Sequence, residues 1–480
     1  MSSPAPAAAP VLLWFRADLR LGDHPGVDWA ARSGGAVIPV FIHDERSGTR
    51  PPGAASRWWL DKSLKSLDQD LQSRGSRLIV RAGDTLAHLE TLIAETGAKA
   101  VICSDPHDPA LSPLHARIEA RLSALKVQLR VFNTTLVHQP GSVRTGSDTP
   151  YKVYSPFARA LRAQLVWPDS IPAPKRLNAP DTWPQSLAIQ DLGFHPTRPD
   201  WSGGFSIWQP GEAGALARLE AFCQSDLAQY KDHRDRADLD ITSRLSPHLR
   251  YGEVSPWTVL RAALEAARQG RATDAAADKL ISEVYWREFA YNLLHIHPAL
   301  SSEPFKPEYA AFPWQPDADA LEAWCRGRTG YSFVDAGMRQ LWVSGWMHNR
   351  VRMVVASVLV KHLLIPWQDG EAWFWDTLVD ACPANNPASW QWVAGCGADA
   401  APYFRIFNPI TQGQKFDPEG RYIRQWVPEL KPLKTSDIHD PSSLSLFQRS
   451  GVGDYPAPLI ACDAGRDRAL RALESLKAAS

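Results

Sequence analysis

The sequence predicts an α/β protein in which an N-terminal doubly wound parallel-sheet domain is joined by a proline-rich linker to an all-helical C-terminal domain. Residues 11–132 alternate short apolar, β-branched runs with helical patterns, which is typical of a parallel sheet with helices on both faces. Residues 168–210 carry eight prolines and little periodicity, which indicates a long surface connection. From about residue 212 onward the apolar spacing is helical.

Five apolar runs are the expected strands of the N-terminal domain. They are "VLLWF" (11–15), "AVIPVFI" (36–42), "RLIV" (77–80), "AVICS" (100–104) and "VQLRVF" (127–132). Between them, helical spacing is clearest at 57–74, 84–96 and 113–126. No G-x-G-x-x-G follows the first run, so the usual dinucleotide-binding fingerprint is absent.

The C-terminal domain is expected to consist of helices. Their patterns fall near 212–228, 256–268, 274–295, 318–326, 332–344, 347–363 and 369–379, with a short helix near 464–477 in a loop-rich tail. We therefore divide the chain into a disordered tail, an α/β domain, a linker and a helical domain at 1–10, 11–135, 136–211 and 212–480.

Composition excludes several classes of protein. The formal net charge is zero, so any DNA site must come from a local patch. We find no apolar run long enough for a transmembrane helix, and "MSSPAPAAAP" (1–10) lacks the features of a secretory signal. The six cysteines are scattered without a C-x-x-C pair, which argues against a metal cluster or disulfide framework and fits the reducing cytoplasm.

Tryptophan is unusually abundant and unevenly placed. Ten of the 20 tryptophans lie between Trp286 and Trp392, so this region is either a thick aromatic core or a site for stacking and redox chemistry. Within it, "ANNPASWQW" (384–392) places two asparagines just before two tryptophans. A turn followed by a core-facing segment would explain the stretch, but buried asparagine amides need partners, which also fits a binding site.

The segment "YKDHRDRADLDITSRLSPHLRYG" (230–252) concentrates groups that suit a phosphate. Hydroxyls, backbone amides and a guanidinium fall within five residues, Thr242, Ser243, Arg244, Leu245 and Ser246. A simple helix cap is the alternative explanation.

A helical segment, "SEVYWREFAYNLLHIHP" (282–298), places Glu283 and Trp286 on one face because they are three residues apart. An acid beside a flat ring can bind a base edge while the ring stacks on the base. The alternative is an i,i+4 surface pair of Glu283 with Arg287 and a core position for Trp286.

A third segment, "GWMHNRVRMVVASVLVKHLL" (345–364), carries a polar stripe of Asn349, Arg352 and Met353 on an otherwise apolar helix. An unpaired buried arginine costs several kcal/mol, on the order of 3–5, so the stripe needs a partner, and Asp380 is the candidate for Arg352. We interpret His348 as a structural or DNA-side residue.

Taken together and in order, several stretches resemble the DNA photolyase/cryptochrome family. They are "LLWFRADLRLGDHP" (12–25), "TSRLSP" (242–247), "YWREF" (285–289), "TGYSFVDAGMRQLWVSGWMHNRVRM" (329–353), "NNPASWQW" (385–392) and "DAAPYFRIFNPITQGQKFD" (399–417). The match runs from about residue 11 to 430, and its several long motifs make it highly specific. The likeness is greatest to class I cyclobutane pyrimidine dimer photolyases.

This resemblance implies that the helical domain holds FAD, folded back on itself, in a pocket without the Rossmann glycines. In the family, the reduced flavin absorbs light and passes an electron to a pyrimidine dimer flipped out of damaged DNA. Asn386 is implied to face the flavin N5, and Trp392 to line the lesion pocket. Trp390 is implied to start an electron-transfer chain to the surface through Trp367 and Trp314.

Further site residues are implied by the same motifs. The flavin phosphates would be gripped by Tyr230, Thr242, Ser243, Arg244, Leu245 and Ser246, and the flavin would lie against the pair Arg352 and Asp380. The dimer pocket would contain Glu283, Trp286, Asn349 and Met353. The DNA backbone would pass near Arg234, Arg350, Arg405 and Lys415.

The chain departs from the family pattern at two places. Many relatives have a second acid two residues after Asp380, where this chain has Cys382. Folate-binding relatives carry a Cys-Lys pair where Ser301 and Ser302 stand here, and "CSDPHDP" (103–109) also departs from the folate-site pattern. The resemblance therefore leaves the presence and identity of a second, light-harvesting pigment open.

The resemblance favours a deoxyribodipyrimidine photo-lyase, a carbon–carbon lyase that acts on damaged DNA, and we expect a cytoplasmic monomer with no membrane partner. A (6-4) photolyase would carry paired histidines in place of Asn349 and Met353. A cryptochrome-type blue-light sensor is the alternative without enzyme activity. Asn386, Glu283, Trp286 and the lack of a long extension after 430 favour repair.

Overall fold

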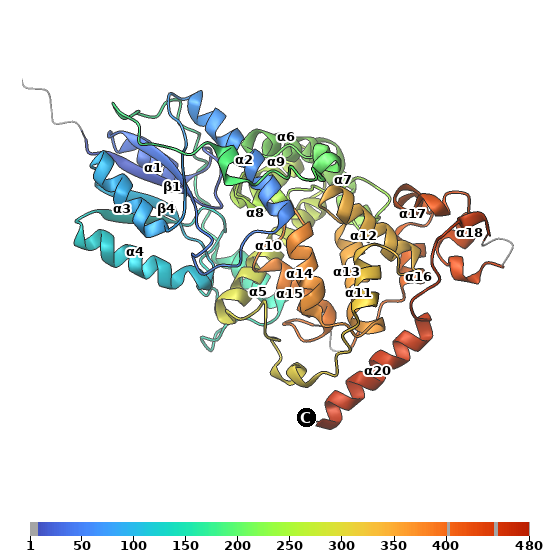
Figure 1. Ribbon diagram of the computed structural model, residues 1–480. Coiled ribbons are helices and arrows are strands. Elements are labelled where there is room, and N and C mark those ends of the chain that lie inside the picture. Colours follow the sequence, from blue (N-terminus) through green and yellow to red (C-terminus); the bar gives the residue numbers. More distant parts are fainter. Residues whose placement is uncertain (1–7, 401–403, 446–449, 480) are drawn as a thin grey trace, which may run out of the picture.

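The structure is a computed structural model that describes residues 8–400, 404–445 and 450–479. It confirms the predicted architecture: a parallel sheet with its helices (blue to cyan) occupies one side of the molecule, and a larger helical assembly (green to red) the other (Figure 1). Residues 1–7 of the expected tail at 1–10 lie outside the described residues.

The N-terminal half contains a five-stranded parallel sheet in the order β3-β2-β1-β4-β5. Its strands are β1 Val11–Phe15, β2 Val37–His43, β3 Ile79–Ala82, β4 Ala100–Ser104 and β5 Gln128–Phe132. Central β1 pairs Val11 with Val37 on one side and with Ala100 on the other. The three central strands, β1, β2 and β4, read as nearly continuous apolar runs because helices cover both faces of the sheet, whereas edge strand β5 is partly exposed.

Four helices cross over between these strands, as the alternating pattern requires. They are α1 Pro25–Arg32, α2 Ala54–Gln72, α3 Thr85–Thr96 and α4 Ser112–Ala124. Helix α3 shows why such boundaries are readable from sequence. The Asp84 side chain accepts a hydrogen bond from the Ala87 amide at its start, and Gly97 ends the helix with a φ of 69°.

A helix that the sequence patterns did not reveal, α5 (Tyr154–Gln164), lies within the expected linker at 136–211. It buries Tyr154, Phe157 and Leu161 on one stripe and packs against α10 (Asp274–Ile296). Pro156 in its first turn hides the pattern, although proline is tolerated there because the first amides of a helix have no intrahelical partner.

The rest of the described chain is helical. Its α-helices are α6 Glu212–Ala221, α7 Leu227–His233, α8 Ser246–Arg250, α9 Pro256–Arg268, α10, α11 Ala318–Cys325, α12 Ser332–Ser344, α13 Asn349–Ser357, α14 Trp367–Thr377, α15 Asn385–Ala394, α16 Pro409–Phe416, α17 Arg421–Trp426, α18 Thr435–Ile438 and α20 Cys462–Ala479. The helices expected near 212–228 and 347–363 each continue through a π-helical turn, at Phe222–Asp226 and Val358–His362.

Polar contacts join the sheet domain to the helical assembly at several points. Arg20, only 2% exposed, donates to three carbonyl oxygens of its own half, those of Gly22, Asp23 and Thr134, and to the Gly252 carbonyl of the helical half. Farther along the interface, the Trp375 indole donates to the Pro51 carbonyl at 2.8 Å. The two halves therefore share buried hydrogen bonds.

Candidate functional site

The predicted site residues meet around one cavity of about 580 Å³, which we call the main cavity. Its lining includes every residue expected to hold the cofactor or the dimer: Tyr230, Thr242, Ser243, Arg244, Leu245, Ser246, Glu283, Trp286, Asn349, Arg352, Met353, Asp380, Asn386, Trp390 and Trp392. Arg234 and Arg350, expected near the DNA backbone, also line it. Chain segments more than a hundred residues apart are thus brought together.

One end of the main cavity is a polar loop that precedes α8. Arg244 adopts a φ of 49° and forms an ion pair with Asp240 at 2.9 Å, while its Nε atom is buried without a hydrogen-bond partner. Arg218 of α6 donates to the carbonyls of Thr242 and Ser243 and so fixes the loop. An unpaired guanidinium N–H beside two hydroxyls suits a phosphate oxygen, so the residues present fit the FAD phosphates.

Sequence patterns did not identify Arg218. It lies about one helical turn from the end of α6, where nothing in the local pattern distinguishes it from a surface arginine. Its contacts are with backbone carbonyls 24 and 25 residues away, and no residue type in the sequence signals such an acceptor.

The expected partnership of Arg352 and Asp380 is present. Two guanidinium nitrogens of Arg352 contact the two carboxylate oxygens of Asp380 at 3.1 and 2.9 Å. The Ser246 hydroxyl donates to Asp380 at 2.6 Å, and Arg352 also donates to the Met347 carbonyl. This bidentate, hydrogen-bonded arrangement holds both charges in fixed positions on the cavity wall.

Cys382, which replaces the acid of many relatives, is buried and accepts hydrogen bonds from Asn385. The Asn385 backbone and side-chain amides lie 3.1 and 3.0 Å from its sulfur. The thiol therefore serves as an acceptor at the start of α15, although sulfur is a weak one. The stretch at 384–392 is this helix, with Asn385, Asn386 and Pro387 in its first turn, and not a turn before a core-facing segment.

Asn386 is buried and firmly held. Its Nδ2 atom donates to both the backbone carbonyl and the Oε1 atom of Glu371, at 3.0 and 2.7 Å. Glu371 in turn forms an ion pair with Arg50 of the N-terminal half at 2.7 Å. Burial raises the pKa of the Glu371 carboxyl, while the hydrogen bond from Arg50 opposes this rise.

Trp286 forms part of an aromatic wall of the main cavity. Its ring stacks on Tyr154 of α5 with centroids 3.6 Å apart and planes 8° from parallel. The Tyr154 hydroxyl donates to Ser282, and burial raises its pKa to about 12. Trp286 is half-buried: its ring packs against the neighbouring core and also lines the cavity.

Glu283, one turn before Trp286, forms ion pairs with Arg234 and with Lys279, the latter at 2.9 Å. The alternative pairing of Glu283 with Arg287 is wrong, because Arg287 donates to the Thr135 carbonyl at 2.6 Å and to the Leu249 carbonyl. Arg287 is 9% exposed, so it is a buried connector and not a surface residue.

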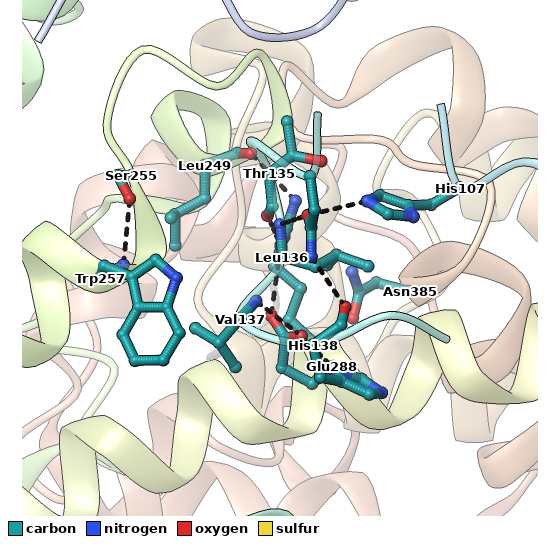
Figure 2. A network of polar contacts seen from close by, with 12 residues as sticks. His107, Thr135, Leu136, Val137, His138, Leu249, Ser255, Trp257, Glu288 and Asn385 are labelled. Atoms are coloured by element: carbon teal, nitrogen blue, oxygen red, sulfur yellow. Dashed lines mark hydrogen bonds and ion pairs between the residues drawn. The ribbon is translucent and has the colours of Figure 1, made fainter. Parts of the chain in front are cut away.

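The segment at 135–138 fixes the position of α10. Figure 2 shows this segment beside the helix, where the Val137 amide donates to Glu288 and His138 Nδ1 lies 2.7 Å from the same carboxylate oxygen. Glu288 is fully buried. These bonds, together with those of Arg287, fix the backbone from which Glu283 and Trp286 project into the cavity.

Helix α13 begins at the edge of the main cavity, where Asn349 is exposed and Met353 is half-buried. Arg350 forms an ion pair with Asp235 at 2.6 Å. His348 accepts a hydrogen bond from the Arg350 amide and donates to the Arg234 carbonyl, so it is a structural residue that caps the helix. Burial lowers the pKa of His348 to about 4.

Trp390 lies between the main cavity and the aromatic core. Phe374 and Trp324, which sequence reasoning missed, pack against its ring with centroids 5.0 and 6.0 Å away. A Cβ atom at Gly370 would lie 2.2 Å from the Trp390 ring, so α14 approaches Trp390 closely at this point. Buried Trp367 begins the same helix, while half-buried Trp314 packs on Phe312 with centroids 4.4 Å apart.

Arg405 and Lys415, also expected near the DNA backbone, do not line the main cavity, and both are exposed. Arg234, by contrast, is largely buried and holds Glu283. Arg405 instead lines a neighbouring cavity together with Trp392, which also lines the main cavity.

A second cavity of about 390 Å³ lies between the two halves. Trp14, His43 and Arg50 line it from the N-terminal half, and Tyr291 and Ser301 from the helical half. Ser301 is one of the two serines that replace the Cys-Lys pair of folate-binding relatives. Three side chains, those of Arg250, Arg287 and Glu371, lie between this cavity and the residues of the main cavity.

Two further observations concern the described part of the chain. It contains no group of three or more His, Cys, Asp or Glu residues placed to hold a metal ion. None of its helices is both long and apolar enough to cross a membrane.

Comparison with known proteins agrees with this geometry. Residues 11–176 match the family model for DNA photolyase, and residues 280–475 match that for the FAD binding domain of DNA photolyase. The deoxyribodipyrimidine photo-lyase of Agrobacterium fabrum is 45% identical over 98% of both chains. Cryptochrome-1 of Arabidopsis thaliana is 35% identical over 97% of this chain and 70% of its own.

A solved structure, that of a bacterial class III photolyase from Agrobacterium tumefaciens, superimposes with a TM-score of 0.95. It is 44% identical, with 99% of each chain covered. FAD is the expected cofactor of the helical domain. The match of residues 280–475 to an FAD binding domain supports this expectation, and so does the polar loop of the main cavity. The chain belongs to the DNA photolyase/cryptochrome family.

Proposed function

We propose that the protein is a light-driven DNA-repair enzyme that splits cyclobutane pyrimidine dimers. One observation carries this proposal: the residues suited to the FAD phosphates and an aromatic wall suited to a flipped pyrimidine dimer line the same cavity. A base that leaves the duplex needs a ring to stack on and a polar group for its edge. Trp286 and Glu283 provide them on adjacent turns of α10.

When bound, reduced FAD would supply under light an electron that opens the dimer and then returns to the cofactor. The chain's own residues hold and orient the reactants. Arg244 and the nearby hydroxyls bind the cofactor phosphates, and Trp286 offers the ring face opposite Tyr154 to the dimer. Arg234 and Lys279 hold the Glu283 carboxylate in place as an acceptor for a base edge.

The two alternative functions differ in what they require of the cavity. Asn349 and Met353 stand where a (6-4) photolyase would carry paired histidines, which disfavours that class. A cryptochrome-type sensor needs FAD but no lesion pocket. The stacked ring of Trp286 and the fixed carboxylate of Glu283 favour repair over signalling alone.

Several finer assignments belong to the same proposal. The likeness to a structure described as a class III photolyase favours that class over the class I likeness of the sequence motifs. The second cavity is the proposed place for a light-harvesting pigment. We also propose damaged DNA as the partner of a monomeric, cytoplasmic enzyme; scattered free cysteines support a reducing compartment.

Illumination of the FAD-loaded, reduced protein with an oligonucleotide that contains a thymine dimer tests the function. We expect dimers to disappear under blue light and to persist in a dark control. Loss of (6-4) products instead of cyclobutane dimers would identify the other photolyase class. Intact dimers in the presence of bound, reduced FAD would reject the repair function and support a sensor.

A further inference from the structure

Arg50 reaches from the N-terminal half of the molecule to the helix that supports the main cavity. It lies in the segment between β2 and α2, and its guanidinium contacts Glu371 of α14 at 2.7 Å. The same guanidinium lies 4.7 Å from the centroid of the Trp375 ring, one turn farther along α14. Arg50 is thus held by two residues of one helix, an acid and a ring.

The backbone around Arg50 is fixed as well. The Trp375 indole donates to the Pro51 carbonyl at 2.8 Å, and the Ala54 amide donates to Asp376 at 2.8 Å. A Cβ atom at Gly53 would lie 2.2 Å from the Trp375 carbonyl, so only glycine permits this approach. Arg50 therefore starts from a backbone with little freedom to move relative to α14.

Glu371 transmits this contact to the main cavity, because its two carboxylate oxygens have different partners. Oε2 meets Arg50, whereas Oε1 accepts from Asn386 Nδ2 at 2.7 Å. The Glu371 side chain is only 3% exposed, so water competes little for either contact. Asn386 donates in addition to the Glu371 backbone carbonyl.

These contacts determine the orientation of the Asn386 amide. A carboxylate and a carbonyl can only accept hydrogen bonds, so the Asn386 NH₂ group must face Glu371 and its Oδ1 atom must point away. Asn386 lines the main cavity. Its oxygen is then the atom offered to a bound flavin, and it can accept a hydrogen bond from an N–H group there.

We propose that Arg50 is a positioning residue for the flavin: by holding Glu371 as a carboxylate, it fixes Asn386 with its oxygen toward the cofactor. This inference rests on the proposed placement of the flavin beside Asn386. Without Arg50, Glu371 could become protonated and the Asn386 amide could turn, for the following reason. Burial raises the pKa of Glu371 and Arg50 opposes this rise, so without Arg50 the carboxyl takes up a proton more readily. A protonated carboxyl can donate to Asn386 and allow its amide to turn.

The midpoint potential of the bound flavin tests this inference. An acceptor for the flavin N–H favours the reduced, protonated cofactor, so its loss should lower the potential. We expect Arg50→Ala to lower the potential in the same direction as Asn386→Ala, and Arg50→Lys to restore most of the difference. Arg32→Ala is the matched control, because exposed Arg32 pairs with Asp28 at the surface of the same half and should leave the potential unchanged.

A double-mutant cycle shows whether the effect passes through Asn386. In the Asn386→Ala background, Arg50→Ala should cause no further shift. An equal shift in both backgrounds, or none in the wild-type background, would overturn the inference while the repair function stands. If Asn386→Ala itself leaves the potential unchanged in FAD-loaded protein, the proposed flavin placement fails, and the inference with it. Arg50→Gln, which removes the charge only, replaces Arg50→Ala if the latter does not hold FAD.

Discussion

Trp286 has one ring face covered by Tyr154, and the proposed function assigns the other face to the lesion. Stacking on an aromatic ring contributes roughly 1–3 kcal/mol per base, which corresponds to about a 5- to 150-fold change in affinity. We expect Trp286→Ala to weaken binding of dimer-containing DNA by a factor in this range. Affinity for undamaged DNA should hardly change, because it comes from phosphate contacts and normal bases are rarely flipped. Titrations with both DNAs measure the difference.

The matched control for this experiment is Trp342→Ala. Trp342 is 60% exposed on α12 and does not line the main cavity, so its loss should leave both affinities unchanged. FAD absorbance must first show that each variant still holds the cofactor. If Trp286→Ala weakens damaged and undamaged DNA equally, Trp286 is a scaffold residue and not part of the lesion pocket.

A second prediction for a single residue concerns His348, because its pKa in the folded protein is about 4, against an ordinary value of 6.5. Between these two pH values the unfolded chain binds a proton that the folded protein does not, so stability falls as the pH falls through this window. At about 1.4 kcal/mol per pKa unit, His348 accounts for about 3 kcal/mol of the loss. His348→Asn, which can still cap α13, should make the free energy of unfolding less dependent on pH. Denaturant titrations across the window measure this.

If the free energy of unfolding depends equally on pH in the wild-type protein and in His348→Asn, groups other than His348 cause the loss of stability in acid. His115 and His362, whose pKa values burial also lowers to about 4, are the candidates. The difference between the two proteins, and not the total loss, therefore isolates His348.

Single residues were predictable where their chemistry leaves few choices. A polar stripe on an apolar helix required a partner for Arg352, and Asp380 provides it. Tyr154, Arg50 and Glu371 were not predictable, since each acts on a residue from a distant segment. Tyr154 contacts Trp286 across more than a hundred residues, and no local pattern distinguishes a tyrosine that will stack from one that will not.

At the scale of elements, α14 and α15 place Trp390 against the core. We expect Trp390→Phe to stop photoreduction of the oxidised enzyme, because the proposed chain of Trp390, Trp367 and Trp314 would lose its first member. Repair by chemically reduced enzyme should persist, since repair uses the flavin's own electron. Absorbance during illumination without DNA measures photoreduction.

Trp324→Phe is the control for this element. Trp324 is fully buried and packs on Trp390, so both variants lose buried volume, and each should cost less than the roughly 3–5 kcal/mol typical of replacing a buried tryptophan by alanine. Only Trp390→Phe should affect photoreduction. Equal photoreduction in wild type and Trp390→Phe would remove Trp390 from the proposed chain and leave it a core residue.

Helices with regular apolar spacing and clear caps, such as α3 and α9, were predictable from sequence. Helix α15 was not, because polar Asn386 and Gln391 are among its buried residues and it opens with two asparagines and a proline. Its stability comes from packing inside the helical assembly and not from local propensity. Helix α5 was missed for the related reason that its apolar stripe is short and interrupted by Pro156.

At the scale of the whole molecule, Arg20 links the two halves, because it binds the Gly252 carbonyl of the helical half and three carbonyls of its own half. Removing this buried guanidinium leaves four carbonyl oxygens without their donor and nearby Asp18 and Asp23 without its charge. We expect Arg20→Met to lower the free energy of unfolding by about 3 kcal/mol or more. The midpoint of unfolding measured by circular dichroism and the midpoint of flavin release should both move to a lower denaturant concentration, and by the same amount.

Arg32→Met provides the comparison, because Arg32 is an exposed residue that pairs with Asp28 on the surface. Ion pairs at the surface contribute about 0–1 kcal/mol to stability, so the free energy of unfolding of this variant should be close to that of the wild type. A change in circular dichroism without earlier flavin release from Arg20→Met would mean that the halves unfold independently.

The stack of Tyr154 on Trp286 also determines where the chain can be cut. A fragment that begins at residue 212, the expected start of the helical domain, would lack α5 and expose the rear face of the Trp286 ring to water. It would also lose the segment at 135–138 that holds Glu288 on α10. The smallest piece of this protein able to form the complete pocket therefore begins before Thr135. The part of the chain that was expected to be a mere connection, including α5, belongs to the catalytic unit.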